Sequence, residues 1–342
     1  MAGVAGLAGC GGHGAAAQST TTTPTRTSVK AGTEPPLHAG PPTVVASGIP
    51  FPTNLAFDRR GRLWVTSGTS GTNPSDGVWY VPPGGRPRHV AKGLTTALGL
   101  AWVGNRLYVG HVASPGDGRI TILEGFTGDR FTSRRVALDG IAVGQHTVGS
   151  IVKGPGGRLF VGVGATSNNG GRPGRVLSFL PSGGKPVLEA TGLRSAFGLA
   201  FQGRRLLVTD NGRDDLGPFR PPDELNAFDP AGPVVDFGFP KCYGQGGPAC
   251  AGSRAPFVTF PPHASPAGIA VKGDVAFVAE NGSSFVRNPT GSDIQRVDLR
   301  TGRRTLFWRS PVKYDPLGTA IGPDGNLYVT LFASGKVVRF DL

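Results

Sequence analysis

The sequence predicts an all-β protein, a six-bladed β-propeller, and three observations support this prediction. The 342 residues include 56 glycines and 31 prolines, about a quarter of the chain, which is typical of many turns rather than long helices. Short runs that alternate apolar and polar residues lie between Gly, Pro, Asn and Asp, as strands do. One hairpin pattern recurs six times along the chain.

Each copy of the repeat is a strand of small apolar residues, a tight polar turn and a second strand. Successive copies begin 45, 50, 49, 70 and 50 residues apart. A period of roughly 40–50 residues with several strands per unit indicates propeller blades. The copies are NLAFDRRGRLWVT (54–66), GLAWVGNRLYV (99–109), GSIVKGPGGRLFV (149–161), GLAFQGRRLLVT (198–209), GIAVKGDVAFV (268–278) and GTAIGPDGNLYVT (318–330). Further strands are expected at 77–81, 119–123, 175–180 and 293–299.

The repeat also predicts how the ring closes and where it is interrupted. Residues 44–46 and 336–340 both have strand character, and pairing them in one blade would close the ring. The 70-residue spacing marks an insertion near residues 211–262. The insertion contains Cys242 and Cys250, and in an exported protein these are expected to form a disulfide.

The N-terminal residues differ in composition from the repeats. Residues 1–10 end in the sequence LAGC, which resembles a bacterial lipobox, so Cys10 is expected to carry a lipid. The other interpretation is a tail with a chance cysteine. Residues 11–42 are rich in Gly, Ala, Ser, Thr and Pro and are expected to form a disordered tether before the propeller at 43–342. The protein is therefore expected to be extracytoplasmic, either lipid-anchored or secreted, with no other contact to the membrane.

The chain is basic, with 35 Lys and Arg against 22 Asp and Glu, a net charge of +13 and a pI near 10.3. The arginines are scattered and often lie in pairs within turns, with no basic helix and no aromatic ladder. This distribution favours a solvated basic surface and argues against a nucleic-acid-binding protein. A basic surface can also attract an anionic cofactor or a membrane surface.

Candidate functional residues follow from the register of the repeat. In a propeller, the loops that enter the innermost strands gather at one mouth of the central channel. The positions four residues before the third, fourth and sixth copies hold Gln145, Arg194 and Tyr314, and His146 and His263 lie one residue from that register. Polar and titratable side chains that converge on a concave surface predict a binding site.

Several segments carry a family resemblance. His146-x-x-Gly149, followed by a Gly-Pro-Gly-Gly turn and Leu-Phe-Val, resembles the catalytic-histidine segment of the soluble glucose/sorbosone dehydrogenases. The segment GLRSAFGLA (192–200) is similar to that family's Gly-Leu-Arg-Asn-Pro-x-Gly-Leu segment. Other segments in the family's order are DNG (210–212), DELN (223–226), PH (262–263) and AENGS (279–283). The resemblance spans roughly residues 45–340.

The resemblance implies a six-bladed propeller that uses pyrroloquinoline quinone (PQQ) and calcium to oxidise an aldose-type sugar at its anomeric carbon. It implies His146 as general base and Arg194 as the group that stabilises the developing oxyanion. Calcium would be bound by the backbone carbonyls of Gly212 and Arg213. An external acceptor would take the electrons. The candidate PQQ-binding residues are Arg287, Gln145 and Tyr314.

Five segments differ from the family's usual residues, and two other functions remain open. Ser195-Ala196 replaces Asn-Pro, Arg213 replaces proline, Asn281 replaces histidine, Ser284-Phe285-Val286 replaces a Trp-Asn stretch, and Ala165 replaces aspartate. A non-catalytic propeller at the cell surface that binds a sugar or a partner is one alternative. A lactonase-like hydrolase is the other, but its metal would need carboxylates at the channel, and few acidic residues lie in the rim register.

Overall fold

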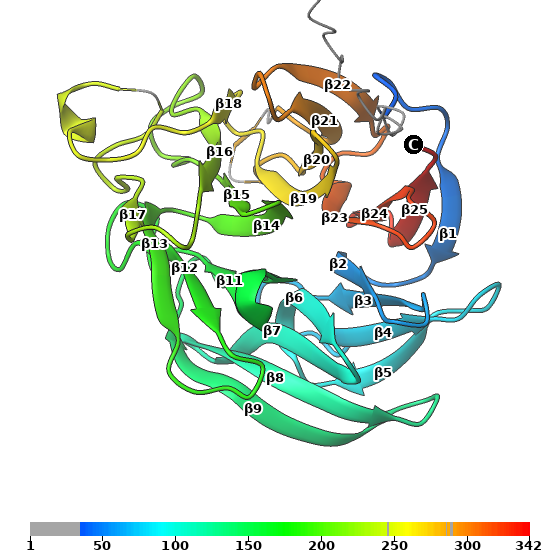
Figure 1. Ribbon diagram of the computed structural model, residues 1–342. Helices are drawn as coiled ribbons and strands as arrows, with labels where there is room; N and C mark the ends of the chain where they lie inside the picture. Colours follow the sequence, from blue (N-terminus) through cyan, green and yellow to red (C-terminus); the bar gives the residue numbers. More distant parts are fainter. Residues whose placement is uncertain (1–34, 245, 285, 288–289) are drawn as a thin grey trace, which may run out of the picture. The chain divides into compact units, whose positions relative to one another are not determined.

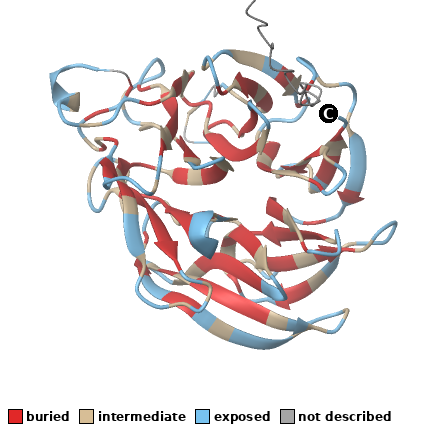
Figure 2. Cartoon of the chain, in the orientation of Figure 1, coloured by how far each residue is buried: buried red, intermediate tan, exposed pale blue. Residues whose placement is uncertain are grey.

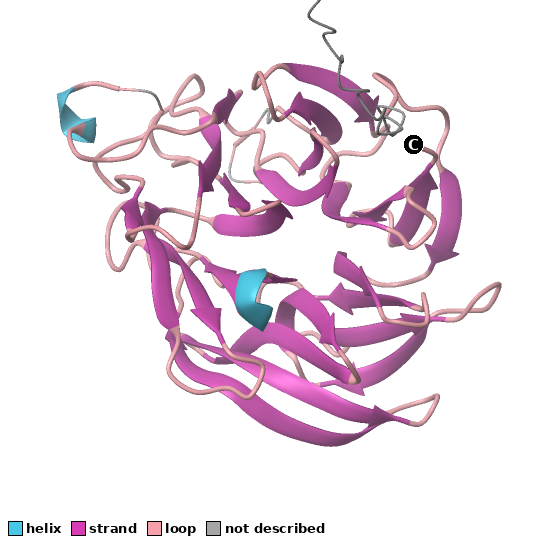
Figure 3. Ribbon diagram, viewed as in Figure 1, coloured by secondary structure: helices cyan, strands magenta, loops and turns pink. Residues whose placement is uncertain are grey.

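A computed structural model describes residues 35–244, 246–284, 286–287 and 290–342. In this part of the chain six sheets surround a central axis, so the predicted six-bladed propeller is confirmed (Figure 1). Two short 3-10 helices interrupt the strands, at Pro155–Gly157 (η1) and Pro248–Cys250 (η2) (Figure 3). No helix among the described residues is long and apolar enough to span a membrane.

The first three blades follow the chain order, each from its innermost strand outward. Blade one contains β2 (Pro52–Phe57), β3 (Leu63–Ser67), β4 (Gly77–Val81) and β5 (Arg88–Lys92). Blade two contains β6 (Thr95–Val103), β7 (Arg106–Ser114), β8 (Asp117–Phe126) and β9 (Phe131–Ala142). Blade three contains β10 (Val148–Lys153), β11 (Leu159–Val163), β12 (Gly174–Phe179), β13 (Val187–Leu193) and a fifth strand, β17 (Val235–Asp236).

The remaining blades complete the ring. Blade four contains β14 (Ala196–Gln202), β15 (Arg205–Asp210), β16 (Asp223–Phe228) and β18 (Val258–Phe260). Blade five contains β19 (Pro266–Lys272), β20 (Val275–Glu280), β21 (Asp293–Asp298) and β22 (Arg304–Arg309). Blade six contains β23 (Pro316–Ile321), β24 (Leu327–Leu331), β25 (Lys336–Phe340) and β1 (Thr43–Ser47). The six sequence copies are the two inner strands of each blade, as predicted.

The small residues of the repeat are explained by close contact between inner strands. A Cβ atom added at Gly99 of β6 would lie 2.1 Å from the carbonyl oxygen of Gly149 in β10. A Cβ atom at Gly198 of β14 would lie 2.1 Å from the carbonyl oxygen of Ala267 in β19. Neighbouring blades therefore meet backbone to backbone around the axis, which leaves no room for side chains at these positions.

The core lies between the blades rather than inside one central cluster. Buried apolar residues form six clusters, and each cluster joins two neighbouring blades. Between blades one and two, the fully buried Trp64 packs against Tyr80, Trp102 and Phe126. Exposed residues are more frequent on the outer strands and loops (Figure 2). Burial of apolar area between blades thus holds the ring together.

The ring closes in blade six, as the sequence predicted. β1 pairs antiparallel with β25, with Ala46 opposite Val337 and Ser47 opposite Lys336. Ahead of β1, the Ala39 amide donates to the carbonyl of Phe307 at 2.9 Å, so residues just before the propeller contact blade five. The candidate lipid site Cys10 and the tether up to residue 34 lie outside the described residues.

The long interruption near residues 211–262 lies inside blade four, between β15 and β18. After β15 the chain makes a loop over residues 211–222, and after β16 a longer excursion over residues 229–257. The excursion supplies β17, which pairs in parallel with β13 of blade three. The predicted disulfide between Cys242 and Cys250 is present and cross-links two parts of the 229–257 segment.

Candidate functional site

A polar cavity lies at the mouth of the ring, where loops enter the inner strands of blades three to five. Its volume is about 140 Å³, and His146, Arg194 and His263 all line it. A wider cleft of about 740 Å³ adjoins it and is lined by residues from all six blades. The two cavities share His146, Ser195, Asn211, Ser265, Asn281 and Ser284. Three residues chosen from the repeat register therefore lie in one cavity.

Short backbone contacts place His146 immediately before β10. The His146 amide donates to the carbonyl of Ala165 at 3.3 Å, and the Gln145 amide donates to Thr166 at 3.2 Å. Gly164 donates in turn to the carbonyl of Thr147 at 2.9 Å. The segment that carries His146 is thus paired with the segment that follows β11, and His146 lines both cavities.

The environment of His146 keeps its imidazole neutral. Burial, followed by the positive charge of Arg194, lowers the pKa of His146 to about 3, although Asp214 acts in the opposite direction. The Nε2 atom is shielded from solvent and has no hydrogen-bond partner among the described residues. A buried, unpartnered nitrogen that faces a cavity can accept a proton from a bound hydroxyl group.

Substitution of Gly164 is expected to displace this imidazole. A Cβ atom at Gly164 would lie 2.1 Å from the Cβ atom of His146, far inside contact distance, so Gly164→Ala must shift His146. A displacement of about 1 Å at a catalytic group can lower a rate by about 100-fold. We expect Gly164→Ala to lower kcat of any reaction in which His146 acts as a base by about this factor, with little change in melting temperature.

Gly170 in the same loop provides the matched control for Gly164. A Cβ atom at Gly170 would meet only the Ser167 hydroxyl, at 3.9 Å, so Gly170→Ala is expected to keep its activity. Dye-linked kinetics of the two variants separate displacement of His146 from a general effect of loop stiffening. Equal activity of Gly164→Ala and the native protein would contradict the assigned position of His146.

Arg194 is buried, and its guanidinium group joins two loops to the end of β13. Its Nη2 donates to Asp214 Oδ2 at 2.7 Å and to Asn168 Oδ1 at 2.6 Å. Its Nη1 donates to the carbonyl of Asn211 at 3.1 Å. A buried arginine with several fixed acceptors has a defined geometry, and its charge is only partly neutralised by one carboxylate.

Asp214 connects Arg194 to blade five. Its Oδ1 accepts a 2.7 Å hydrogen bond from Ser283 Oγ and lies 3.3 Å from Nδ1 of His263. The other ring nitrogen of His263 lies 3.0 Å from the carbonyl of Gly217. The loop over residues 211–222 is therefore held over the cavity from both sides by side chains that line it.

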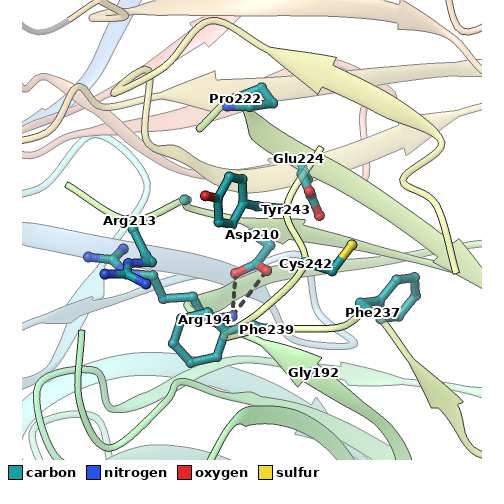
Figure 4. A pocket seen from close by; sticks show the side chains of 11 residues that line it. Gly192, Arg194, Asp210, Arg213, Pro222, Glu224, Phe237, Phe239, Cys242 and Tyr243 are labelled. Atoms are coloured by element: carbon teal, nitrogen blue, oxygen red, sulfur yellow. Dashed lines mark hydrogen bonds between the residues drawn. The ribbon is translucent and has the colours of Figure 1, made fainter. Parts of the chain in front are cut away.

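A second layer of carboxylates lies behind Arg194, around a small enclosed cavity of about 20 Å³ (Figure 4). Asp210 accepts hydrogen bonds from the backbone amides of Arg194 and Ser195, the shorter at 2.6 Å. Glu224 accepts one from the amide of Gly244 at 2.7 Å. Asp223 lines the cavity of about 140 Å³. It fixes the 211–222 loop because it accepts a 2.6 Å hydrogen bond from the amide of Gly212.

These buried carboxylates predict how stability depends on pH. Burial is the largest cause of each shift: it raises the pKa of Asp210 to about 6, of Asp223 to about 8 and of Glu224 to about 7. Because the pKa of each carboxyl group is higher in the folded than in the unfolded protein, its protonation favours the folded state. This stabilisation is complete below the ordinary pKa near 4 and is lost as pH rises through the pKa of the folded state. His146 acts oppositely, but only between its folded pKa near 3 and its ordinary 6.5. We therefore expect the free energy of unfolding to fall between pH 6.5 and 8.5.

Urea denaturation at several pH values tests this expectation. Asp223→Asn removes the group with the highest raised pKa, so it should flatten the pH dependence between pH 6.5 and 8.5. Asp341→Asn, a change at an exposed carboxylate near the C-terminal strand, is the control and should leave the slope unchanged. A free energy of unfolding that is constant or rises over this range would contradict the assigned protonation.

The other predicted site residues occupy less central positions. Gln145 is exposed and lines the wide cleft. The backbone carbonyl of Tyr314 accepts a 2.7 Å hydrogen bond from Asn281 Nδ2. Tyr314 is not among the described residues that line the two cavities. Arg287 is exposed on the loop that follows Asn281, close in sequence to Ser283 and Ser284 of the cavity.

The two residues predicted to bind calcium lie on the 211–222 loop. Gly212 lines the cavity, and the Arg213 side chain is directed away to Asp215, with which it forms an ion pair of 2.7 Å. Within the described ranges, no three His, Cys, Asp or Glu side chains cluster so that they could hold a metal. A calcium ion at this loop would therefore depend on backbone carbonyls, as the sequence resemblance implied, and on oxygen atoms from another molecule.

Asp214 and Asn168 are site residues that the sequence analysis missed. Both contact Arg194, yet both lie on long loops between strands, where the repeat gives no register. Asn211 and Asp223 were within motifs that the sequence singled out, but no role was predicted for them. Such loop residues can be identified as part of the site only from a structure that shows their contacts with a residue such as Arg194.

No protein-family model matches the chain. An uncharacterised protein of Borreliella burgdorferi is 24% identical over 335 residues, covering 84% of this chain and 85% of that protein. The PQQ-bound aldose sugar dehydrogenase of Streptomyces coelicolor has a TM-score of 0.71 and 22% identity, covering 90% of this chain and 99% of the other. The calcium structure of a Trichoderma reesei carbohydrate-active enzyme of family AA12 has a TM-score of 0.72 and 18% identity, covering 89% and 96%. The chain therefore shares the propeller fold of these two solved structures.

Proposed function

We propose that the protein is a PQQ- and calcium-dependent dehydrogenase that oxidises an aldose-type sugar at its anomeric carbon and passes the electrons to an external acceptor. One observation carries the proposal: His146, whose neutral imidazole has an Nε2 without a hydrogen-bond partner among the described residues, lines the same cavity as the buried Arg194. The fold shared with PQQ-bound aldose sugar dehydrogenase and the ordered sequence motifs support it. The identity of the sugar is a separate question.

The residues of the cavity fit a polar, anionic cofactor. Two residues that line it, His146 and Asn211, each have a buried atom, Nε2 and Oδ1, without a hydrogen-bond partner among the described residues. Such atoms are costly unless a ligand or water satisfies them. PQQ has three carboxylates, for which Arg194 and the exposed Arg287 are the candidate cationic partners. For calcium, the carbonyls of Gly212 and Arg213 are the candidate ligands.

The chemistry requires that the sugar lose a hydroxyl proton together with a hydride from the anomeric carbon. PQQ, when bound, supplies the two-electron oxidant that accepts the hydride. His146 Nε2 takes the hydroxyl proton, because its imidazole is neutral at all pH values well above 3. Arg194 provides a fixed positive charge at the cavity wall, which stabilises negative charge that develops during the reaction. Asp214, Asn168 and Asn211 hold that guanidinium in place.

Titration of the purified full chain with PQQ, in calcium and in chelator, tests this proposal. We expect saturable binding that weakens without calcium, followed by reduction of a dye when aldoses are added. Absence of PQQ binding in both conditions would overturn the proposal. Gly170→Ala, remote from the cavity lining, serves as the protein control because its added Cβ meets no close neighbour.

One observation favours a non-catalytic, sugar- or partner-binding function as the second candidate. Ala165 stands where the family usually has aspartate, and the imidazole of His146 makes no hydrogen bond to a described side chain. A general base without an orienting carboxylate is less well positioned. Saturable sugar binding without dye reduction by any aldose, with PQQ and calcium supplied, would favour this candidate.

We also propose that the protein acts outside the cytoplasm, attached through a lipid on Cys10 or released. The disulfide between Cys242 and Cys250 is compatible with an oxidising compartment. Mass spectrometry of the protein from its native membrane fraction tests the lipid, and a Cys10→Ser variant should lose membrane association. Membrane association that persists in this variant would contradict the anchor.

A further inference from the structure

A separate cavity of about 250 Å³, the base cavity, lies between blades one and two at the end of the ring opposite the mouth. The mouth is where loops enter the inner strands, whereas residues of two turns that follow inner strands line this cavity, at 58–62 after β2 and 104–105 after β6. Thr95 at the start of β6 lines the wide cleft, and Trp102 near its end lines the base cavity, roughly 20 Å along the strand. The base cavity is therefore distinct from the proposed site of sugar oxidation.

Positive charge predominates at the base cavity. Arg59, Arg60 and Arg62 line it, and Asp58 is the one acidic side chain among the described lining residues, so three positive charges and one negative charge leave +2. Arg62 is paired with Asp58 at 2.6 Å. Arg59 and Arg60 are exposed, and within the described ranges neither guanidinium group forms a hydrogen bond or an ion pair. Such groups are suited to bind an anion, since each has several donors and no acceptor.

The carboxylate of Asp58 is satisfied by its own turn and by β3. Its Oδ1 accepts hydrogen bonds from the amides of Arg60 at 2.9 Å and Arg62 at 3.1 Å, and its Oδ2 accepts one from Trp64 Nε1 at 3.2 Å. The Arg62 guanidinium also lies 5.4 Å from the ring centre of Phe126 in blade two. These contacts fix the turn that carries the two unpaired arginines, so that less entropy is lost when an anion binds.

Two uncharged donors complete the lining. Trp102 lines the base cavity, and its Nε1 is buried and has no hydrogen-bond partner among the described residues. An indole N–H can only donate, so its burial is costly unless a ligand or water accepts from it. Asn105, exposed on the turn that follows β6, lines the same cavity. Positive charge from blade one and neutral donors from blade two thus line one cavity.

We propose that the base cavity binds the phosphoryl group of a phosphate monoester. A phosphoryl group has three strong acceptor oxygens that do not lie in one plane with one another and the phosphorus, so it can accept hydrogen bonds from blade one and blade two at the same time. A carboxylate has two oxygens in one plane, which suit a single guanidinium group better. A groove of about 410 Å³ adjoins the cavity at Asn105 and leaves room for the rest of the molecule. The inference does not depend on the proposed sugar oxidation.

Calorimetric titration of the full chain with glycerol 3-phosphate and with citrate, in buffer free of phosphate and calcium, tests the site. We expect saturable binding of glycerol 3-phosphate and weaker binding of citrate. The double variant Arg59→Gln/Arg60→Gln should weaken binding of glycerol 3-phosphate by about tenfold or more, because hydrogen bonds between charged groups are lost. Trp102→Phe keeps an aromatic ring and removes the N–H, so it should weaken binding by about tenfold.

The double variant Lys153→Gln/Lys185→Gln is the matched control. Both lysines are exposed at the same end of blade three, and neither is among the described residues that line the base cavity. This control removes the same positive charge, so equal weakening in both double variants would indicate general attraction to a basic surface and would overturn the site. Binding unchanged in Arg59→Gln/Arg60→Gln would place the anion elsewhere, for example at Arg194, and would also overturn it. Citrate binding as tight as that of glycerol 3-phosphate would contradict a phosphoryl site.

A phosphate monoester can also be a lipid headgroup, and a second experiment separates the two sources. Sedimentation with phosphatidylcholine vesicles, with and without phosphatidic acid, is measured for Cys10→Ser, which cannot carry the proposed lipid. Binding that requires phosphatidic acid and is lost in Arg59→Gln/Arg60→Gln, without binding of glycerol 3-phosphate, would support the site and identify its ligand as a lipid. Absence of binding to both glycerol 3-phosphate and these vesicles would overturn the proposal.

Discussion

Replacement of His146 by glutamine is expected to lower kcat of sugar oxidation by about 100-fold to 10,000-fold, the range that a general base contributes. Glutamine is similar in size and polar, but its amide cannot accept a proton at neutral pH. PQQ binding should change little, because the Nε2 atom of His146 is the group that meets the hydroxyl of the substrate in our proposal. Stopped-flow reduction of the bound cofactor by sugar measures this step.

His111→Gln is the matched control for this variant. His111 is also buried and its pKa is also lowered, chiefly by burial, but its Nε2 lies 2.8 Å from Thr121 Oγ1 inside blade two, away from both cavities. We expect this variant to lose some stability and to keep its turnover. If His146→Gln retained native turnover with native folding, another group would have to accept the proton, and the central role proposed for His146 would be wrong.

Replacement of Arg194 by methionine is expected to have two large effects. Methionine fills a similar volume but leaves the mostly buried Asp214 carboxylate without its cation, which costs about 3–5 kcal/mol of folding free energy by analogy with other broken buried pairs. It also removes the fixed positive charge at the cavity wall, so any activity that remains should fall by about 100-fold or more. Urea denaturation and dye-linked kinetics measure the two effects separately.

A double-mutant cycle with Asp214→Asn separates the Arg194–Asp214 interaction from the other contacts of Arg194. If Arg194 mainly balances Asp214, the double variant should be more stable than Arg194→Met alone, while activity stays low because the guanidinium is missing. Arg175→Met is the control, since Arg175 is a buried arginine on β12 whose Nη2 donates to the carbonyl of Ala142, away from both cavities. Additive stability effects of Arg194→Met and Asp214→Asn would contradict a direct ion pair.

The sequence was sufficient for the fold because the propeller is a repeated local pattern. Inner strands need small residues where they meet, as Gly99 and Gly198 show, and this requirement repeats in every blade. The closing pair, β1 with β25, was predictable because both ends of the repeat lacked a partner. The fifth strand of blade three was not predictable, since two residues of an irregular excursion, Val235 and Asp236, form it by pairing with a strand of another blade.

The site was predictable only as far as the repeat register reached. His146, Arg194 and His263 follow directly from positions next to inner strands, and all three line the cavity. Asp214 lies four residues beyond β15 on a loop with no counterpart in other blades, so its contact with Arg194 depends on loop geometry that no local pattern encodes. The net charge gave still less information about the site, because a chain with a net charge of +13 has a cleft with no Asp, Glu, Lys or Arg among its described lining residues.

The closure of the ring in blade six has a consequence for how the protein folds. β1 comes from one end of the propeller and β25 from the other, so their pairing brings together segments separated by nearly the whole domain. Contacts of such long sequence separation form slowly, because the entropy of joining distant segments must be overcome first. Until they form, the strands next to the gap have unpaired edges that can bind other chains. Because such pairing between chains leads to aggregation, refolding yield should fall steeply with protein concentration. Cells that produce this protein must likewise limit association between chains whose ring has not yet closed.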